Sequence, residues 1–385
     1  MRQHAFVPRD YEVFAGLDVD KRSISVTFTD HQGLSRSMRI PYSVEHLLTY
    51  VGKHFAGQQV AFAYEAGPTG YGLYDGLVAH GAPCVVASPS MIPKAPGQRV
   101  KTNRLDSRGL AETLRGGQLK SIHVPSPPYR DLRHLTQLRD TFVSELVGMK
   151  LRIKALLLVE GIEFPPAPAG SQWSGRVKQH LRTLPCSGTV RFKLDQLLDS
   201  VEFAEQQVLK TTREIRRCCQ RDPELSRCIA LLRTIPGIGW IVASQLLARI
   251  GDWRVLENVR QLGGFLGVVP SERSTGENTE RGSITHTGDR RLRGKLIQAA
   301  WAAIRQDREL RDFYRSVCRT HPRARASRVA IVAVARKLST RIAAVLMQQR
   351  PYVVRASVHA GPVAQEETSP QGTTRRQAEP GEPSS

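Results

Sequence analysis

Alternating and periodic apolar positions divide the chain into an N-terminal part with strands and a longer helical part. Between residues 14 and 88, short apolar or alternating segments indicate strands, and two amphipathic segments between them indicate helices. The expected strands are Phe14–Val19, Ser23–Thr29, Leu34–Ile40, Val60–Glu65 and Pro83–Ser88, and the expected helices begin after Ser43 and cover Tyr71–Ala79.

Near-heptad spacing predicts two long helices in the middle of the chain. Apolar residues step by three and four from Leu132 to Leu156, and a second stripe runs from Leu194 to Ile215. A Pro- and Gly-rich segment, 164–175, separates the two. The pattern fits an antiparallel or intermolecular coiled coil, and it fits a plain helical hairpin within one chain equally well. From Leu225 to Met347 the pattern predicts a compact helical domain.

These patterns predict four parts with different folds. Three strands, a helix, a strand, a helix and a strand is the element order of an RNase H-like α/β fold, expected over 12–126. A helical, coiled-coil region follows over 127–224, and a mainly α C-terminal domain with a helix-hairpin-helix-like motif covers 225–347. The segment 351–385 is rich in Pro, Gly, Ser, Thr, Gln and Glu. Such a composition buries too little apolar surface to fold, so we expect a disordered tail.

The charge of the chain indicates a polyanionic partner. Lys and Arg number 56 against 35 acidic residues, which gives a net charge of +21 and a pI near 10.3. Nucleic acid is the commonest partner of such a surface. No apolar run approaches the roughly 20 residues of a spanning helix, so no membrane partner is expected. The N-terminus lacks the apolar core of a secretory signal, and the six cysteines show no paired spacing. We therefore expect a cytoplasmic protein with reduced thiols.

Three carboxylates lie where an RNase H-like fold would bring them together. Asp18 lies within the first strand, Glu65 ends the fourth, and Asp106 opens a helical stretch. An isolated carboxylate at such a position is more often a cap or a surface residue. Together, however, the three would repel one another unless a divalent cation such as Mg²⁺ bound between them. The same fold hosts actin-like ATPases, but no Gly-rich phosphate loop follows Asp18.

The C-terminal domain contains Gly-rich turns and a basic cluster. The segment Thr234-Ile-Pro-Gly-Ile-Gly resembles a helix-hairpin-helix turn, in which Gly237 and Gly239 would expose backbone N–H groups to a DNA phosphate. The alternative is a tight turn with a packing role only. Five cations further along form a cluster suited to phosphate contacts, namely Arg281, Arg290, Arg291, Arg293 and Lys295. Hydroxyl residues lie among them, but their spacing alone does not single out a nucleophile.

Taken in order, the motifs resemble those of the insertion sequence 110 family of transposases. The N-terminal set is Gly16-Leu-Asp-Val-Asp-Lys, Tyr64-Glu-Ala-Gly-Pro-Thr-Gly and Lys101-Thr-Asn-Arg-Leu-Asp-Ser. The C-terminal set is Thr234-Ile-Pro-Gly-Ile-Gly, Gly267-Val-Val-Pro, and Ser274-Thr-Gly followed by Gly282-Ser-Ile-Thr-His-Thr-Gly-Asp. The resemblance extends from about residue 14 to residue 347.

The resemblance implies a site-specific DNA recombinase that excises and inserts its own element. It implies an Mg²⁺-binding DEDD site similar to that of Holliday-junction resolvases, and a serine that attacks a DNA phosphate to form a covalent intermediate. It also implies a homo-oligomer, a dimer or tetramer, with DNA as its partner. In some members a structured noncoding guide RNA selects the DNA.

Matched by position, Asp18, Glu65 and Asp106 are the first, second and fourth acidic residues of the family motif. The third falls on Asn103, which keeps a carbonyl oxygen for Mg²⁺ but lacks the charge. Asp20 is expected to point to the opposite face of the strand from Asp18.

The nucleophile motif falls on Ser274-Thr275-Gly276. Ser274 is preferred as the nucleophile, with Thr275 as the alternative. Two other functions stay open, namely a structure-selective nuclease that uses water, and a catalytically decayed DNA-binding protein.

Overall fold

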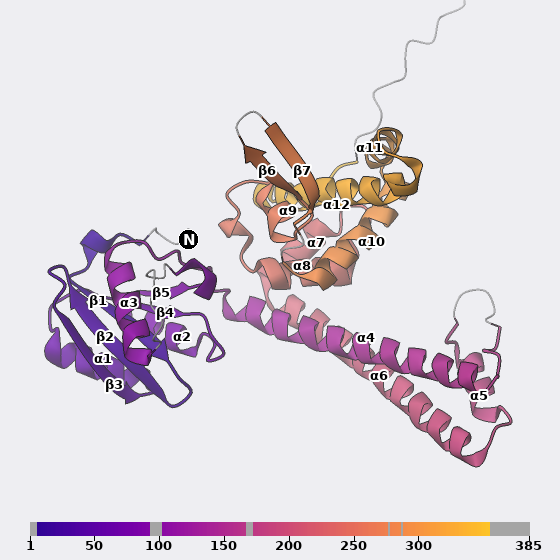
Figure 1. Cartoon of the computed structure of the whole chain (residues 1–385), viewed down its shortest axis with the longest axis horizontal. Helices are drawn as coiled ribbons and strands as arrows, with labels where there is room; N and C mark the ends of the chain where they lie inside the picture. The colour runs from indigo at the N-terminus through magenta and orange to yellow at the C-terminus, as the bar shows by residue number, and fades with distance from the viewer. Residues whose placement is uncertain (1–5, 93–101, 167–171, 276–277, 286–287, 355–385) are drawn as a thin grey trace, which may run out of the picture.

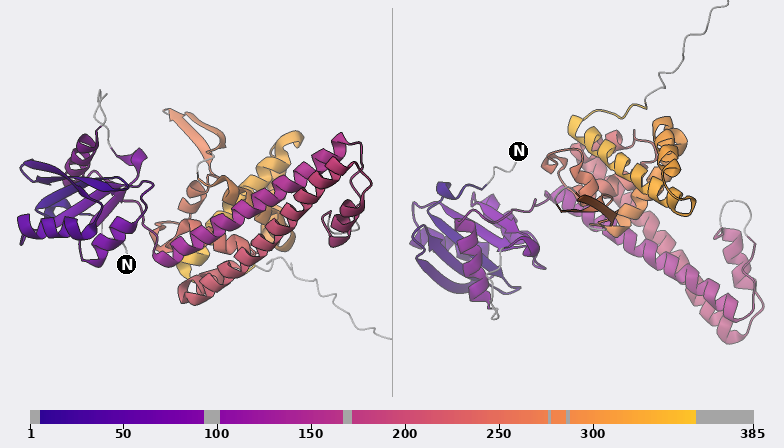
Figure 2. Two further views of the ribbon diagram at one scale, coloured as in Figure 1. Left: turned by 90° about the horizontal axis from the view of Figure 1, so that it is seen from below. Right: turned by 45° about the horizontal axis from the view of Figure 1, so that its top comes forward.

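The computed structural model describes residues 6–92, 102–166, 172–275, 278–285 and 288–354. These residues form an N-terminal α/β domain, a long two-helix hairpin and a C-terminal helical domain that carries a small β-hairpin (Figure 1). The long hairpin extends away from the α/β domain, and the helical domain packs on its near end (Figures 1 and 2).

A five-stranded mixed sheet forms the centre of the N-terminal domain. Its order is β3-β2-β1-β4-β5, with β1–β2 and β2–β3 antiparallel and β1–β4 and β4–β5 parallel. This is the RNase H-like arrangement that the element order predicts. The strands are β1 Val13–Val19, β2 Ser23–Asp30, β3 Ser35–Pro41, β4 Val60–Glu65 and β5 Cys84–Ala87.

Helices cover the two faces of this sheet differently. Alternate residues of β1 and β4, such as Leu17 and Phe62, pack on one face in a core that includes Leu47 of α1 (Val44–His54) and Leu73 of α2 (Gly72–Ala79). The intervening positions, including Phe14, pack on the other face against α3 (Asn103–Arg115). The side chain of Thr102 accepts a hydrogen bond from the Leu105 N–H and fixes the start of α3.

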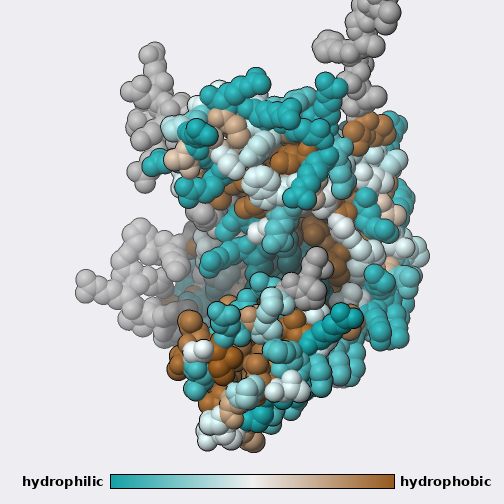
Figure 3. All heavy atoms as spheres, turned by 90° about the vertical axis from the view of Figure 1, so that its right-hand side faces the viewer, coloured by the Kyte–Doolittle hydropathy of each residue, from teal (hydrophilic) through white to brown (hydrophobic). Residues whose placement is uncertain are grey.

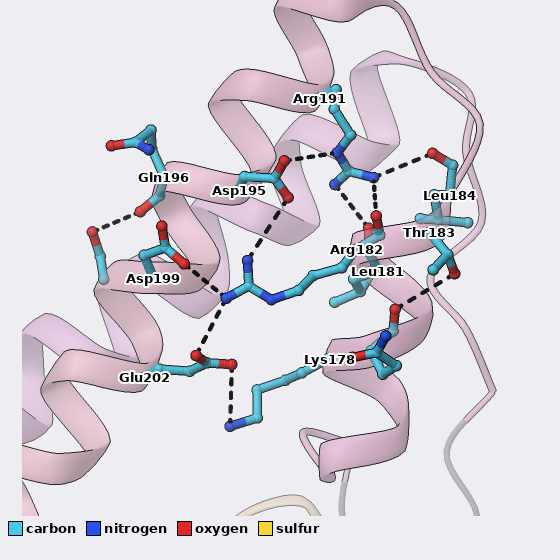
Figure 4. A network of polar contacts seen from close by, with 12 residues as sticks. Lys178, Leu181, Arg182, Thr183, Leu184, Arg191, Asp195, Gln196, Asp199 and Glu202 are labelled. Carbon is cyan, nitrogen blue, oxygen red and sulfur yellow. Dashed lines mark hydrogen bonds and ion pairs between the residues drawn. The ribbon is translucent and has the colours of Figure 1, made fainter.

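The middle of the chain is an antiparallel hairpin of two helices within one chain. Helix α4 (Pro127–Val159) pairs along its length with α6 (Gly188–Arg221), and α5 (Gly175–Thr183) packs at the far end. An ionic network joins α5 to α6: Arg182 lies 2.7 Å from Asp199 and 3.2 Å from Glu202, and Lys178 approaches Glu202 to 4.0 Å (Figure 4). The pattern of apolar positions predicted the two long helices but not α5, which lies at the end of the Pro- and Gly-rich segment.

The C-terminal domain is helical, as predicted, apart from a two-stranded hairpin. Its helices are α7 Pro223–Leu232, α8 Trp240–Ile250, α9 Gln261–Phe265, α10 Arg290–Gln306, α11 Arg308–Arg319 and α12 Arg323–Gln348. The strands β6 (Pro270–Thr275) and β7 (Asn278–Ile284) form a ribbon that projects from these helices (Figures 1 and 2). Because the ribbon is polar at most positions, its sequence lacks the apolar alternation that would predict two strands.

The ordered chain continues past the expected start of the tail. The backbone N–H of Tyr352 donates to Thr234 Oγ1 at 2.7 Å, and its hydroxyl donates to Asp307 Oδ2 at 2.6 Å. The expectation of disorder from Pro351 onward was therefore wrong for Tyr352, and residues 355–385 lie outside the described residues.

All six cysteines are free thiols in the structure. Burial raises the pKa of the Cys219 thiol to about 12 and that of Cys228 to about 11, so both stay protonated near neutral pH. In the part of the chain that the structure describes, no helix is both long and apolar enough to cross a bilayer.

Candidate active site

The first two predicted carboxylates lie at the same end of neighbouring parallel strands. The register of β1 and β4 pairs Leu17 with Tyr64, and both side chains pack on the α1–α2 face of the sheet. The next residues, Asp18 and Glu65, therefore lie on the opposite face, next to each other in the register. Asp18 is half-buried and Glu65 is exposed.

Helix α3 brings the third carboxylate to the same corner because Gly16 lets it lie directly on β1. A Cβ on Gly16 would lie 2.1 Å from the Ser107 carbonyl oxygen and 2.4 Å from the Ala111 nitrogen. The buried Ser107 hydroxyl also lies 2.8 Å from Thr27 Oγ1 of β2. Asp106 directly precedes Ser107 in the first turn of α3, so its backbone lies near the half of β1 that contains Asp18. We refer to Asp18, Glu65, Asn103 and Asp106 as the acidic corner.

The side chain of Asn103 is oriented by the carboxylate of Asp20. Its Nδ2 donates to Asp20 Oδ2 at 2.9 Å, and Arg39 lies 3.9 Å from the same oxygen. The expectation that Asp20 points away from Asp18 was wrong, because residues two apart in an extended segment share a face. The spacing itself contained this signal, and the corner therefore has one more carboxylate nearby than predicted.

The donor atoms of the acidic corner suit a hard divalent cation. Three carboxylates and the Asn103 carbonyl offer oxygen atoms only, which Mg²⁺ and similar ions prefer. Within the described ranges, no three His, Cys, Asp or Glu side chains converge closely enough to be identified as a metal-holding group. The corner therefore fits such an ion by the chemistry of its donor atoms, although its described side chains are not drawn together around one point.

The candidate nucleophiles lie on a different part of the molecule. Ser274 and Thr275 are the last two residues of β6, paired in register with Thr279 and Asn278 of β7. Near the base of the ribbon, Ser271 Oγ donates to the Ser283 carbonyl at 3.0 Å. Gly276 lies outside the described residues. Within one chain the structure does not bring the ribbon and the acidic corner together (Figure 1).

The two glycines predicted to contact DNA lie in different environments. Gly237 has φ +84°, and a Cβ there would lie 2.2 Å from the Ala299 carbonyl oxygen, so this glycine packs the α7–α8 turn against α10. Gly239 is exposed at the start of α8 and has open space around it. Only Gly239 is free to approach a ligand.

The five predicted cations also differ in their surroundings. Arg290 and Arg291 are exposed at the start of α10, and they line a cavity of about 400 Å³. Arg293 is buried and donates to the Leu266 carbonyl at 3.2 Å, whereas Lys295 forms an ion pair with Asp140 at 2.6 Å. Arg281 lies on β7, opposite Glu272 in the register. Two of the five cations therefore stabilise the domain internally.

An RNase H-like sheet with carboxylates near its strand ends, joined to a helical domain with exposed arginines, fits a DNA-processing enzyme. Residues 15–160 match a family described as transposase, and residues 229–315 match the Transposase IS116/IS110/IS902 family. The chain is 33% identical over 304 residues to protein y4qE of Sinorhizobium fredii, whose name describes it as a transposase. That alignment covers 76% of this chain and 72% of y4qE.

Two further relatives carry informative names. The transposase for insertion sequence element IS1111A of Coxiella burnetii is 25% identical over 72% of this chain and 75% of its own length. The pilin gene-inverting protein of Moraxella bovis is 28% identical over 40% of this chain and 48% of its own length. The chain belongs to the Transposase IS116/IS110/IS902 family, and it is a DNA transposase of an insertion sequence.

Proposed function

We propose that this transposase cleaves and exchanges DNA strands through a serine–DNA intermediate, with the acidic corner holding Mg²⁺. The observation that supports this most directly is the shared corner itself. Asp18 and Glu65 lie near the ends of neighbouring strands on the face covered by α3, and Gly16 allows the first turns of α3, which carry Asp106, to pack closely on β1. Carboxylates drawn together around one phosphate would repel one another, and a bound cation would offset that repulsion.

The chemistry divides between the two parts of the site. A bound Mg²⁺ would supply positive charge to the non-bridging oxygens of the scissile phosphate. Asp18, Glu65 and Asp106 would hold it through carboxylate oxygens, and Asn103 through its carbonyl. The Asp20 carboxylate orients Asn103 by accepting from its amide N–H, which leaves the Asn103 carbonyl oxygen available as a ligand.

The serine step exchanges one phosphate ester for another. Ser274 Oγ attacks phosphorus, the Oγ–P bond forms, and the bond from phosphorus to one deoxyribose oxygen breaks. The serine hydroxyl gives up its proton and the departing deoxyribose oxygen gains one, so the proton count balances. A hydroxyl is a weak nucleophile near neutral pH, so the step depends on charge stabilisation at the phosphate. Thr275 offers the same chemistry one residue further along.

The site is proposed to assemble from more than one chain. Apolar side chains remain exposed on the α4–α6 hairpin after its own helices have paired, among them Leu151, Leu158 and Phe203. Figure 3 looks onto the far end of this hairpin and shows apolar surface among polar side chains there. A homo-oligomer, a dimer or tetramer, would cover this surface. It would also let the ribbon of one subunit approach the acidic corner of another.

The nucleic-acid partners follow from the family and the charge. Element-end DNA and target DNA are the substrates, and a structured guide RNA is the proposed selector of sequence, since the net charge of +21 suits both. The name of the pilin gene-inverting relative supports recombination, rather than cleavage alone, as the outcome of the reaction.

Trapping the covalent intermediate tests the proposal. Element-end DNA, its associated RNA and Mg²⁺ are incubated with the protein, and an SDS-resistant protein–DNA band is sought. Ser274→Ala and Thr275→Ala are run alongside, since each removes one hydroxyl. The expected result is a band that is lost with Ser274→Ala alone. Asp18→Ala is expected to abolish the band as well.

Other outcomes assign the chemistry differently. Loss of the band with Thr275→Ala alone would move the nucleophile by one residue. Cleaved ends without an adduct would replace the proposal with a structure-selective nuclease that uses water. Normal adducts from Asp18→Ala would remove the acidic corner from the mechanism.

A further inference from the structure

The C-terminal domain contains a stretch without carboxylates that none of the family motifs includes. After Asp312, no Asp or Glu occurs up to Val354, whereas nine Lys and Arg do. Five of these nine gather around the turn between α11 and α12. We call them the basic turn: Arg315, Arg319, Arg323, Arg325 and Arg328.

The arginines of the basic turn are exposed and have little internal role. Arg319, Arg323 and Arg325 form no ion pair with any residue in the described ranges, and Arg315 comes no closer than 3.9 Å to Asp312. Arg328 donates only to the Ala324 carbonyl of its own helix. By contrast, two cations later in α12 form ion pairs within the domain. Lys337 pairs with Glu309 at 2.8 Å, and Arg341 pairs with Glu309 and Asp307.

The position of the basic turn on α12 is electrostatically unfavourable for the free protein. Arg323 and Arg325 lie in the first turn of this helix, where the backbone dipole already places partial positive charge. No acidic residue lies in that turn, and no side chain caps it. A bound anion would offset both the side-chain charges and the helix end.

The basic turn adjoins the ribbon that carries the candidate nucleophiles. A cavity of about 420 Å³ is lined by Val317, His321 and Arg328 and also by Gly282 and Ser283 of β7. Pro270, the first residue of β6, lies on the same cavity. A strand bound along the basic turn would therefore pass the base of the ribbon.

We infer that the basic turn binds the sugar–phosphate backbone of the nucleic-acid strand that the β6–β7 ribbon engages. The recognised chemistry is a row of phosphodiesters, and the contact positions the strand without reading its sequence. The link to the reacting hydroxyl rests on the proposed function, but the binding surface itself does not. DNA and guide RNA share this chemistry, so the experiment includes both.

The salt dependence of binding measures the number of phosphate contacts. Affinities for element-end duplex DNA and for single-stranded RNA of the same sequence are measured without Mg²⁺ from 50 to 200 mM salt. The test variant is Arg319→Gln, Arg323→Gln, Arg325→Gln. Each lost contact to duplex DNA should flatten the log–log slope by about 0.9, so the three together remove about 2.7. Over this fourfold range of salt, wild-type affinity should fall about 40-fold further than that of the variant.

Two matched variants separate specific contacts from general charge. Arg213→Gln, Arg217→Gln, Arg221→Gln removes three exposed arginines from α6, and the slope should change by less than about one contact's worth. Replacing the three arginines of the basic turn by Lys keeps the charge and should keep most of the slope. Equal melting temperatures exclude misfolding as the cause of lost binding.

The outcomes decide between the sources and test the idea. If the triple variant has a flatter salt slope than wild type with duplex DNA, the surface is assigned to DNA. If its slope is flatter only with RNA, the surface is assigned to the guide RNA. An unchanged slope, or an equal loss in the α6 variant, would refute the inference. Failure of the proposed function would look different, because wild-type protein would then form no adduct while the slope difference remained.

Discussion

At the level of single residues, the amide side chain of Asn103 limits the negative charge of the acidic corner. Asn103 Nδ2 donates to Asp20 Oδ2 at 2.9 Å, so the amide stabilises a neighbouring carboxylate that would otherwise add to the repulsion. The family pattern has an acidic residue here. With Asn103 in place of a carboxylate, the corner has less negative charge and less repulsion among its side chains.

Asn103→Asp is predicted to tighten Mg²⁺ binding and to destabilise the metal-free protein. The new carboxylate would face Asp20 without a hydrogen bond, and Mg²⁺ would offset the repulsion. Tenfold tighter binding adds about 1.4 kcal/mol at saturation, which corresponds to roughly 6 °C of extra thermal shift for the α/β domain. The measurement compares melting temperatures in EDTA and in Mg²⁺ for both proteins. Equal Mg²⁺-induced shifts would contradict the idea that Asn103 faces the ion.

Sequence positions predicted where Asp18 and Glu65 lie on the sheet, but not the surroundings of the C-terminal glycines and arginines. Asp18 and Glu65 lie where strand alternation puts them, because register and face follow directly from period-two spacing. The packing of Gly237 on Ala299 and the burial of Arg293 depend on α10, which is distant in sequence. Local pattern contains no information on such contacts, so a glycine or arginine with a packing role looks the same as one that binds DNA.

At the level of elements, Asp307 joins three segments of the C-terminal domain. It is 1% exposed and caps α11 by accepting from the Leu310 N–H at 3.1 Å. It also pairs with Arg341 of α12 at 2.8 Å and accepts from the Tyr352 hydroxyl. Burial raises the pKa of the Asp307 carboxyl, but the hydrogen bonds and the Arg341 charge outweigh it and hold the pKa below its usual range.

Asp307→Asn should destabilise the C-terminal domain at neutral pH by about 2 kcal/mol, because it leaves the Arg341 charge with only the exposed Glu309 as its partner. The depressed pKa stabilises the fold above the ordinary aspartate value of about 3.9, and this contribution is lost as pH falls through the folded pKa. The difference between wild type and variant should thus be constant from pH 7 to 5 and shrink below about pH 4. Urea unfolding across this range measures it. Asp312→Asn, at an exposed position of α11, is the control and should change stability little.

The strands and long helices followed from apolar periodicity, whereas the β6–β7 ribbon did not. All five predicted strands and both long helices occur, with ends shifted by a few residues. The ribbon is polar and is fixed by main-chain pairing and by contacts at its base, such as Ser271 with Ser283. Elements that do not bury an apolar face give no periodic signal. For the same reason the ribbon's role had to be inferred from the family motif.

At the level of the whole molecule, the separation of the ribbon from the acidic corner is the central constraint. The α4–α6 hairpin lies between the two domains in sequence, and its far end, beside α5, lies far from both domains (Figure 1). If Ser274 and Asp18 act on one phosphate, either a large domain movement or a second subunit must bring them together. The exposed apolar side chains of the hairpin favour a second subunit.

Mixing two inactive proteins tests this arrangement. Ser274→Ala keeps a complete acidic corner, and Asp18→Ala keeps the nucleophile, so neither alone should form an adduct. In a mixed oligomer, a site shared between subunits would combine the intact corner of one chain with the intact serine of the other. Adduct formation should therefore return, and a size tag should place it exclusively on the Asp18→Ala chain. A double variant, Asp18→Ala with Ser274→Ala, mixed with either single variant is the control and should stay inactive. If the mixture of the two single variants is also inactive although mixed oligomers form, each site belongs to one chain, and domain movement must close the gap.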